Sequence, residues 1–188
     1  MPNNHQHLLS TIETLAGDLR AKTFRAAAEF VLQHDNRPII ECGCFRGEVS
    51  EGQSTLILGL LASAMNTQLI SVDWNNDNIE KARAAVKHLP HVTFRLCDSV
   101  RFLSAERQLP VLLYLDSYDY SKENPLPCQI HQACEVGAAY GKLVRPCCVL
   151  LDDHITGTGG KTLLSSMFLK ERGWRLAAEG YQLLYVLE

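Results

Sequence analysis

The sequence predicts an α/β fold: a doubly wound, seven-stranded, mostly parallel sheet with helices on both faces and a C-terminal antiparallel hairpin. Three observations predict it. Short apolar runs alternate with helical stretches from residue 38 onwards. Residues 174–188 hold two strand-like runs around Glu179-Gly180, with no room for a helix between them, so one of these strands must run antiparallel to its neighbour. At 188 residues and 46% hydrophobic, the chain has the size and composition of one domain with one sizeable core.

The N-terminal part differs from the rest because it contains no strand pattern. Leu8, Ile12, Leu15 and Leu19 recur at helical spacing, and residues 35–38 (Asp-Asn-Arg-Pro) end the helical pattern. We therefore divide the chain into an N-terminal helical segment, residues 1–36, and an α/β core, residues 37–188.

Within the core, strands and helices follow one another without a linker or repeat. The predicted strands are 38–43, 68–73, 92–98, 111–116 and 147–153. The predicted helices between and after them are 54–65, 78–89, 99–107, 129–144 and 161–172. Asn and Asp residues at 75–78 suit a helix N-cap, and Gly173 suits a C-cap.

Composition excludes several classes of protein. A net charge of −3 provides no basic field for nucleic acid or an anionic membrane surface. No apolar run approaches the roughly 20 residues that a membrane span needs, and the first residues lack the basic and apolar regions of a signal peptide. The seven cysteines form no C-x-x-C pair, which is typical of buried thiols in a reducing compartment, so we expect a cytoplasmic protein.

The chemistry is expected where the five predicted strands of the core end, since ligands of open α/β sheets bind outside the carboxyl ends of the strands. Each strand ends in a carboxylate: Glu41, Asp73, Asp98, Asp116 and the pair Asp152-Asp153. Glycines four apart in the first loop permit a tight turn and close approach of a ligand, although neither dinucleotide nor phosphate-loop spacing is present. Asp73 can accept hydrogen bonds from both hydroxyls of a ribose, and Asp98 from an adenine amino group. These residues predict a nucleoside-containing cofactor.

The ordered segments ECGCFRG, ISVD, RLCDS, LLYLDSYDY and LLDDHITGTGG, with the final hairpin, identify a family. Over residues 38–188 the chain resembles the class I S-adenosylmethionine-dependent methyltransferases, in particular small-molecule O-methyltransferases. The resemblance implies S-adenosylmethionine as cofactor and an oxygen of a small molecule as methyl acceptor. The residues implied to bind the cofactor are Glu41, Gly43, Phe45, Gly47, Ser54, Asp73, Trp74, Asp98, Ser99 and Asp116. The chain departs from the family by inserting residues 48–51, two of them acidic, into the loop that faces the cofactor.

The resemblance also implies a metal site, because cation-dependent O-methyltransferases bind Mg²⁺ through an Asp after the fourth strand and an Asp-Asn pair after the fifth. Asp116 and Asp153 match the aspartates, and His154 stands where the Asn would be. Imidazole suits transition metals better than Mg²⁺. We therefore predict a divalent cation, Mg²⁺ or a transition metal, on Asp116, Asp153 and His154; alternatively Asp152 turns inward as a ligand, or no metal binds.

The general base is the second departure. Such relatives carry a Lys three residues after the fourth-strand Asp, where this chain has Asp119. His154 is the predicted replacement because its ordinary pKa lies near neutral pH, with Asp119 and Lys122 next. The predicted catalytic residues are His154, Asp116 and Asp119.

Two other functions remain open: a metal-dependent oxygenase of the non-haem iron type, or a nucleoside-binding domain without catalysis. Whichever of these functions the core has, only residues 1–36 are left to pack on it or to cover the substrate site. We therefore expect an open site, a bulky acceptor, or a second subunit, as in a homodimer, that completes the wall.

Overall fold

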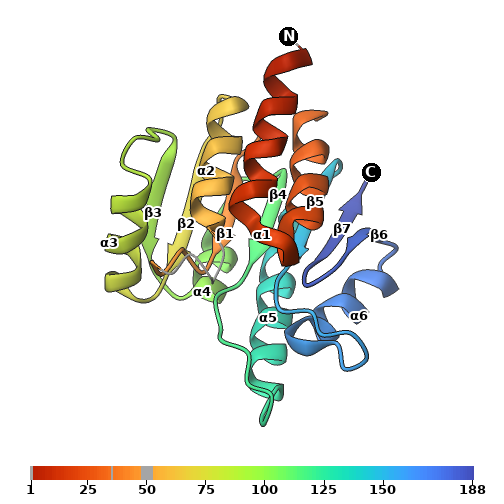
Figure 1. The fold of residues 1–188 in the computed structure, drawn as a ribbon. Coiled ribbons are helices and arrows are strands. Elements are labelled where there is room, and N and C mark those ends of the chain that lie inside the picture. Colours follow the sequence, from red (N-terminus) through yellow and green to blue (C-terminus); the bar gives the residue numbers. More distant parts are fainter. Residues whose placement is uncertain (1, 35, 48–52) are drawn as a thin grey trace.

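A computed structural model describes residues 2–34, 36–47 and 53–188, and its strands form one sheet in the order β3-β2-β1-β4-β5-β7-β6 (Figure 1). The strands are β1 (Ile39–Cys42), β2 (Leu69–Asp73), β3 (Val92–Leu96), β4 (Leu112–Leu115), β5 (Cys147–Leu151), β6 (Arg175–Glu179) and β7 (Leu183–Leu187). The pairs among β1 to β5 are parallel, and β7 runs antiparallel to both β5 and β6. This arrangement confirms the predicted fold class.

The helices follow the predicted alternation with small shifts at their ends. They are α1 (Pro2–Leu32), α2 (Ser54–Ala64), α3 (Asn76–Ala85), α4 (Ser99–Ala105), α5 (Leu126–Ala139) and α6 (Leu163–Glu171). Short 3₁₀ helices, η2 (Tyr140–Lys142) and η3 (Gly160–Thr162), follow α5 and precede α6. Gly17 has non-helical angles (φ 65°, ψ 172°), so α1 consists of two helical halves that meet at this residue.

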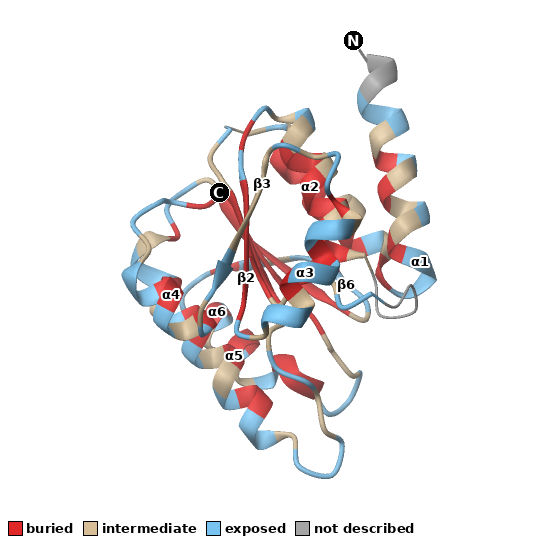
Figure 2. Ribbon diagram, turned by 90° about the vertical axis from the view of Figure 1, so that its left-hand side faces the viewer, coloured by how far each residue is buried: buried red, intermediate tan, exposed pale blue. Residues whose placement is uncertain are grey.

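The sheet is covered on both faces, with α1 and α2 on one side and α4, α5 and α6 on the other (Figure 2). Neighbouring strand residues alternate between the two layers: Ile39 and Leu69 pack with α1 and α2, whereas Ile40 and Ile70 pack with the other helices. A parallel strand buried on both faces needs apolar residues at successive positions, which explains the continuous apolar runs in the sequence.

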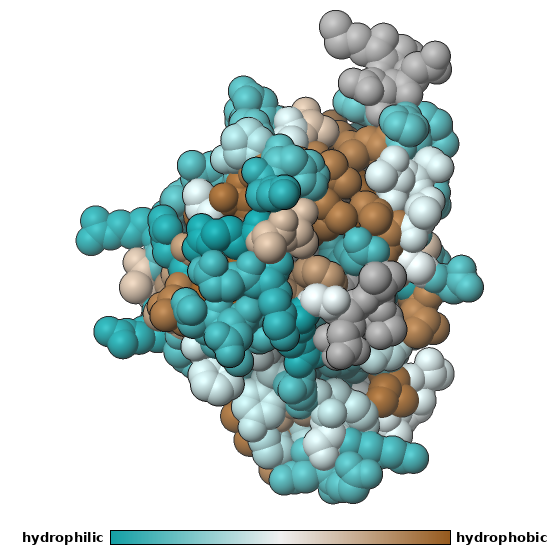
Figure 3. Space-filling view, turned by 60° about the vertical axis from the view of Figure 1, so that its left-hand side comes forward, coloured by the Kyte–Doolittle hydropathy of each residue, from teal (hydrophilic) through white to brown (hydrophobic). Residues whose placement is uncertain are grey.

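Helix α1 packs along α2 and over β5, β6 and β7, and its Ile12, Phe24 and Val31 are buried. Hydrophobic atoms gather on the surface beside this helix (Figure 3), where a cavity of about 310 Å³ lies between α1 and α2. The predicted homodimer stays a prediction.

None of the described helices combines the length and apolar character that crossing a membrane requires.

The carboxyl ends of the central strands lie level with one another, and this register creates the site. The Asp116 amide donates to the Cys42 carbonyl (2.8 Å), and the Gly43 amide donates to the Val72 carbonyl (2.8 Å). The loops after β1, β2 and β4 therefore leave the sheet side by side, and the residues that follow these strands share one edge.

Candidate active site

Three neighbouring cavities lie along this edge and share lining residues, and we call this row of cavities the trough. The β2–β3 cavity measures about 280 Å³, the central cavity about 210 Å³ and the β4–β5 cavity about 460 Å³. The first two share Asp73, Trp74 and Ser117. The last two share Arg46, Asp116 and Asp119.

The loop after β1 is held close to β4, and only glycine fits at its start. Gly43 has φ +89°, and a Cβ there would lie 2.2 Å from the carbonyl oxygen of Asp116. Gly47 likewise has φ +104°. The predicted insertion at residues 48–51 lies outside the described residues, so the described part of the loop ends at Gly47.

Glu41 does not line the trough but supports this loop through hydrogen bonds inside the core. Its carboxylate is fully buried and accepts hydrogen bonds from Thr55 Oγ1 (2.8 Å) and Ser71 Oγ (2.6 Å). Thr55 Oγ1 in turn accepts from the amide of Phe45 (2.9 Å). Burial raises the pKa of Glu41 to about 7, against the hydrogen bonds that lower it. Ser54 is also buried, at the start of α2.

Asp73 lies at the end of β2, where the β2–β3 and central cavities meet. The amide of Asn75 donates to its Oδ1 (2.7 Å), and the amide of Cys44 donates to its Oδ2 (3.2 Å). These bonds fix the carboxylate while it still borders the trough. Trp74 beside it is 73% exposed and lines both cavities.

Asp98 and Ser99 lie where β3 passes into α4 and line the β2–β3 cavity. Asp98 is the N-cap of α4, since its Oδ1 accepts from the amide of Arg101 (2.8 Å). Its side chain is exposed, whereas Ser99 is buried.

A polar network that the sequence did not predict lines the β2–β3 cavity through Ser99, Ser117 and His131. Ser99 Oγ lies 3.0 Å from His131 Nε2, and Ser117 Oγ donates to Glu135 Oε1 (2.5 Å). The Glu135 contact raises the pKa of His131, against the effect of burial. Because His131 meets Ser99 and Glu135 through the same ring nitrogen (3.0 and 3.6 Å), the three do not form a nucleophilic relay, which uses both nitrogens.

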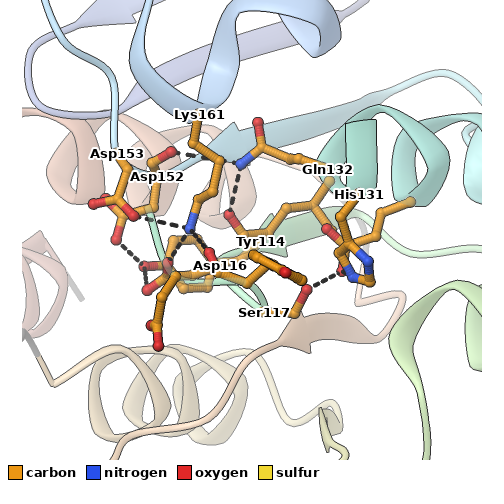
Figure 4. Close-up of polar contacts among 12 residues, drawn as sticks. Tyr114, Asp116, Ser117, His131, Gln132, Asp152, Asp153 and Lys161 are labelled. Atoms are coloured by element: carbon orange, nitrogen blue, oxygen red, sulfur yellow. Dashed lines mark hydrogen bonds and ion pairs between the residues drawn. The ribbon is translucent and has the colours of Figure 1, made fainter. Parts of the chain in front are cut away.

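The most charged part of the site is a buried cluster around Lys161 (Figure 4). Its Nζ lies 2.6 Å from Asp116 Oδ1 and 2.9 Å from Asp153 Oδ2, and it donates to the Tyr118 carbonyl (2.9 Å). The lysine side chain is 1% exposed. Burial alone would lower the pKa of Lys161, but Asp116, Asp153 and Asp152 raise it above its ordinary value. Lys161 is therefore an ammonium at neutral pH and not a general base.

Asp152 and Asp153 point to different partners. Asp152 is fully buried and paired with Arg20, whose Nε and Nη2 lie 3.2 and 3.1 Å from Oδ2, and it accepts from the Tyr114 hydroxyl (2.9 Å). Burial would raise the pKa of Asp152, but Arg20 and then Lys161 lower it below its usual range. Asp153 Oδ1 accepts from the Tyr181 hydroxyl (2.6 Å).

The other two predicted catalytic residues lie apart from this cluster. His154 Nδ1 lies 3.0 Å from Thr162 Oγ1 and Nε2 lies 3.6 Å from Glu179 Oε1, and His154 lines none of the three cavities. Asp119 lines the central and β4–β5 cavities, where its Oδ1 accepts from Arg46 (2.7 Å).

The residues do not fit the predicted divalent cation. The structure brings Asp116 and Asp153 together, but an ammonium lies between them and His154 faces other partners. Asp152 does not offer the alternative ligand, since it is paired with Arg20. Across the described ranges, 2–34, 36–47 and 53–188, no group of three His, Cys, Asp or Glu side chains is arranged to hold a metal ion.

Comparison with known proteins establishes the fold. No protein-family model matches the chain, and no curated protein matches it. The O-methyltransferase NovP has a similar structure, with a TM-score of 0.66 at 13% identity over 90% of this chain and 80% of NovP. The N-methyltransferase NodS from Bradyrhizobium japonicum, solved with S-adenosyl-L-homocysteine, gives 0.54 at 12% identity over 95% of this chain and 96% of NodS.

A proposed rRNA methylase from Clostridium thermocellum is also similar, with a TM-score of 0.63 at 15% identity over 90% of this chain and 96% of that one. The three names refer to methylation of oxygen, nitrogen and RNA. This chain therefore has the fold that these methyltransferases share, and the fold leaves the acceptor open.

Proposed function

We propose that the protein is an S-adenosylmethionine-dependent methyltransferase that transfers the methyl group to an oxygen of a small molecule. The observation that carries the proposal is the trough along the carboxyl ends of β1 to β5, with Asp73 where the β2–β3 and central cavities meet. The similarity to methyltransferases, one of them solved with S-adenosyl-L-homocysteine, supports this choice of cofactor.

The residues along the trough suit the parts of this cofactor in order. Ser99 and Asp98 border the β2–β3 cavity, which takes the adenine end. Asp73 offers carboxylate oxygens to the ribose hydroxyls, and the loop at Gly43 borders the central cavity, which takes the methionine part. When bound, the cofactor supplies a sulfonium methyl group that an acceptor oxygen displaces directly. The protein's main contribution is to align the two reactants.

Asp116 is the proposed proton acceptor, because it borders both the central and the β4–β5 cavities. Burial, with help from Asp152 and Asp153, raises the pKa of Asp116 well above its usual range although Lys161 opposes the shift. A carboxylate with a raised pKa is a better base near neutral pH. Asp119 lines the same cavities and is the second candidate, whereas a catalytic role of His154 stays a prediction from the sequence.

The acceptor end suits a small neutral or cationic molecule better than nucleic acid. Three carboxylates, Asp116, Asp119 and Asp153, line the β4–β5 cavity, and its two arginines are both paired with carboxylates, Arg20 with Asp152 and Arg46 with Asp119. Carboxylates repel the phosphates of RNA, and the net charge of −3 gives no long-range attraction. Oxygen as the accepting atom follows the resemblance of the sequence motifs to small-molecule O-methyltransferases; NovP, an O-methyltransferase, is among the proteins of similar fold.

We do not propose an iron-dependent oxygenase. That chemistry needs two imidazoles and a carboxylate, or a similar set of three ligands, around one metal with open positions. Among the described residues the structure keeps His154 away from the pair Asp116 and Asp153, which a lysine occupies.

Cofactor binding is tested by calorimetry with S-adenosylmethionine and S-adenosylhomocysteine on the full chain. Asp73→Ala is expected to weaken binding by about 10- to 100-fold, because charge-assisted hydrogen bonds contribute about 1.5–3 kcal/mol. Asp77→Ala is the matched control, since Asp77 carries the same charge four residues away, is exposed and does not line the trough. If the wild-type protein binds neither compound at millimolar concentration, the proposal is wrong.

Methyl transfer is tested with methyl-labelled cofactor, a panel of small hydroxyl compounds and total RNA. The expected product is a labelled methyl ether. Labelled RNA would refute the small-molecule acceptor. Binding of S-adenosylhomocysteine without transfer to any acceptor would favour the nucleoside-binding domain without catalysis.

A further inference from the structure

Lys161 is surrounded by oxygen atoms at the acceptor end of the trough. Carboxylates from the ends of two strands, Asp116 after β4 and Asp153 after β5, lie 2.6 and 2.9 Å from its Nζ, and the carbonyl oxygen of Tyr118 lies 2.9 Å away. An ammonium has three N–H donors, and these three oxygens match them in number. Lys161 has no donor left over for an acceptor molecule, so its effect passes through the two carboxylates.

The backbone turn after β5 places Lys161 between the two carboxylates. The amide of Lys161 donates to the Asp153 carbonyl (3.0 Å), so both ends of the lysine contact the same aspartate. Gly160 has φ +53°, and a Cβ there would lie 2.2 Å from that carbonyl, so the turn requires glycine. Gln129 of α5 donates to the Gly160 carbonyl (2.8 Å) and fixes the turn from the other side. These contacts therefore fix the turn that carries Lys161.

Tyrosine hydroxyls lie near the second oxygen of each of these carboxylates. Tyr181 donates to Asp153 Oδ1 (2.6 Å), and Tyr114 lies 3.4 Å from Asp116 Oδ2. The Tyr114 hydroxyl donates to Asp152 (2.9 Å), so the second oxygen of Asp116 accepts no strong bond from it, whereas the second oxygen of Asp153 is bound by Tyr181. A metal ion at this place would have to displace the ammonium.

We propose that the Lys161 ammonium holds the place of a divalent cation between Asp116 and Asp153, so that the acceptor end of the trough works without a metal ion. Lys161 is then a positioning residue: it aligns Asp116 and balances the two negative charges, the tasks that a divalent cation performs between two carboxylates. The positioning role of Lys161 in catalysis rests on the proposed methyl transfer, whereas its place in the cluster can be tested by metal binding alone.

The experiment titrates the full chain with MnCl₂ and follows free Mn²⁺ by electron paramagnetic resonance. Lys161→Ala removes the ammonium and leaves two facing carboxylates, which suit Mn²⁺. We expect this variant to gain one Mn²⁺ site with a Kd at least about tenfold below that of the wild type. The double variant Lys161→Ala/Asp153→Asn should lose the site again.

Lys142→Met is the matched control. Lys142 Nζ also donates to three oxygens, the carbonyls of Leu103, Ser104 and Ala138, but it has no carboxylate partner among the described residues. This variant loses a comparable set of hydrogen bonds and should gain no Mn²⁺ site.

Two results would overturn the proposal. One is a single Mn²⁺ bound by the wild-type protein and lost in Asp153→Asn. The other is a folded Lys161→Ala that binds Mn²⁺ no better than the wild type. If Lys161→Ala does not fold, the wild-type protein decides: an increase of its Tm by Mn²⁺ that Asp153→Asn removes would refute the proposal, and methyl transfer that EDTA leaves unchanged would support it. Absence of any cofactor binding would instead refute the proposed function and leave the metal titration informative.

Discussion

Glu41→Gln should remove a large part of the pH dependence of stability. Glu41 is fully buried, and burial raises its pKa from 4.5 to about 7. Below pH 4.5 both the folded and the unfolded chain hold this proton, and the stabilisation is complete. Between that value and about 7 only the folded chain holds it, so the free energy of unfolding falls as pH rises. The difference between these two pKa values corresponds to a loss of about 3 kcal/mol in the free energy of unfolding. Glutamine does not titrate, so this fall should disappear in the variant.

The assay is urea unfolding of both proteins at steps between about pH 4 and about pH 8, which spans the window from 4.5 to about 7 that the linkage predicts. Fluorescence of the buried Trp174 reports unfolding. Glu80→Gln is the control, since Glu80 lies on the exposed face of α3 and should change the pH dependence by less than about 1 kcal/mol. Equal pH dependence in wild type and Glu41→Gln would refute the reasoning, because it would mean that Glu41 ionises as an exposed carboxylate does.

Two further substitutions test the packing around the trough. Gly43→Ala should lower the free energy of unfolding by about 2–4 kcal/mol, because its Cβ would meet the loop after β4 and its φ is positive; Gly137→Ala, in α5 with no atom within 4 Å of an added Cβ, should instead stabilise by up to about 1 kcal/mol in the same urea experiment. Arg20→Met should cost about 3–5 kcal/mol because it leaves Asp152 buried without its counter-charge, whereas Arg25→Met removes only solvent-exposed ion pairs and should cost much less. Comparable losses for the two arginine variants, or for the two glycine variants, would contradict these assignments.

The sheet could be predicted because each strand is a continuous apolar run and each helix has its own period. Helix ends were harder: α5 begins at Leu126 instead of 129, since prolines are tolerated in the first turn of a helix, where the missing amide has no intrahelical partner.

Part of the candidate site could not be predicted, because it depends on backbone turns and distant contacts. Asp153 and His154 are adjacent in sequence, which suggested one shared site, but Asp153 has φ 60°, and the chain turns there so that the two side chains meet different partners. Lys161 lies in a glycine-rich turn, a pattern typical of exposed loops. Its burial depends on Asp116, 45 residues earlier in the chain.

The break in α1 at Gly17 divides this helix into two parts that are fastened in different ways. After the break, Arg20 is bound to Asp152, and Thr23 donates to Gln182 (2.6 Å), so this half is tied to the sheet by buried polar bonds. Before it, the described side chains hold the helix mainly through apolar packing on α2, with a half-exposed pair between Glu13 and Arg25. Apolar contacts slide more easily than hydrogen-bonded ion pairs. The second half of α1 therefore lines the β4–β5 cavity in a fixed position, whereas the first half can open separately. Amide hydrogen exchange should be faster in the first half than in the second.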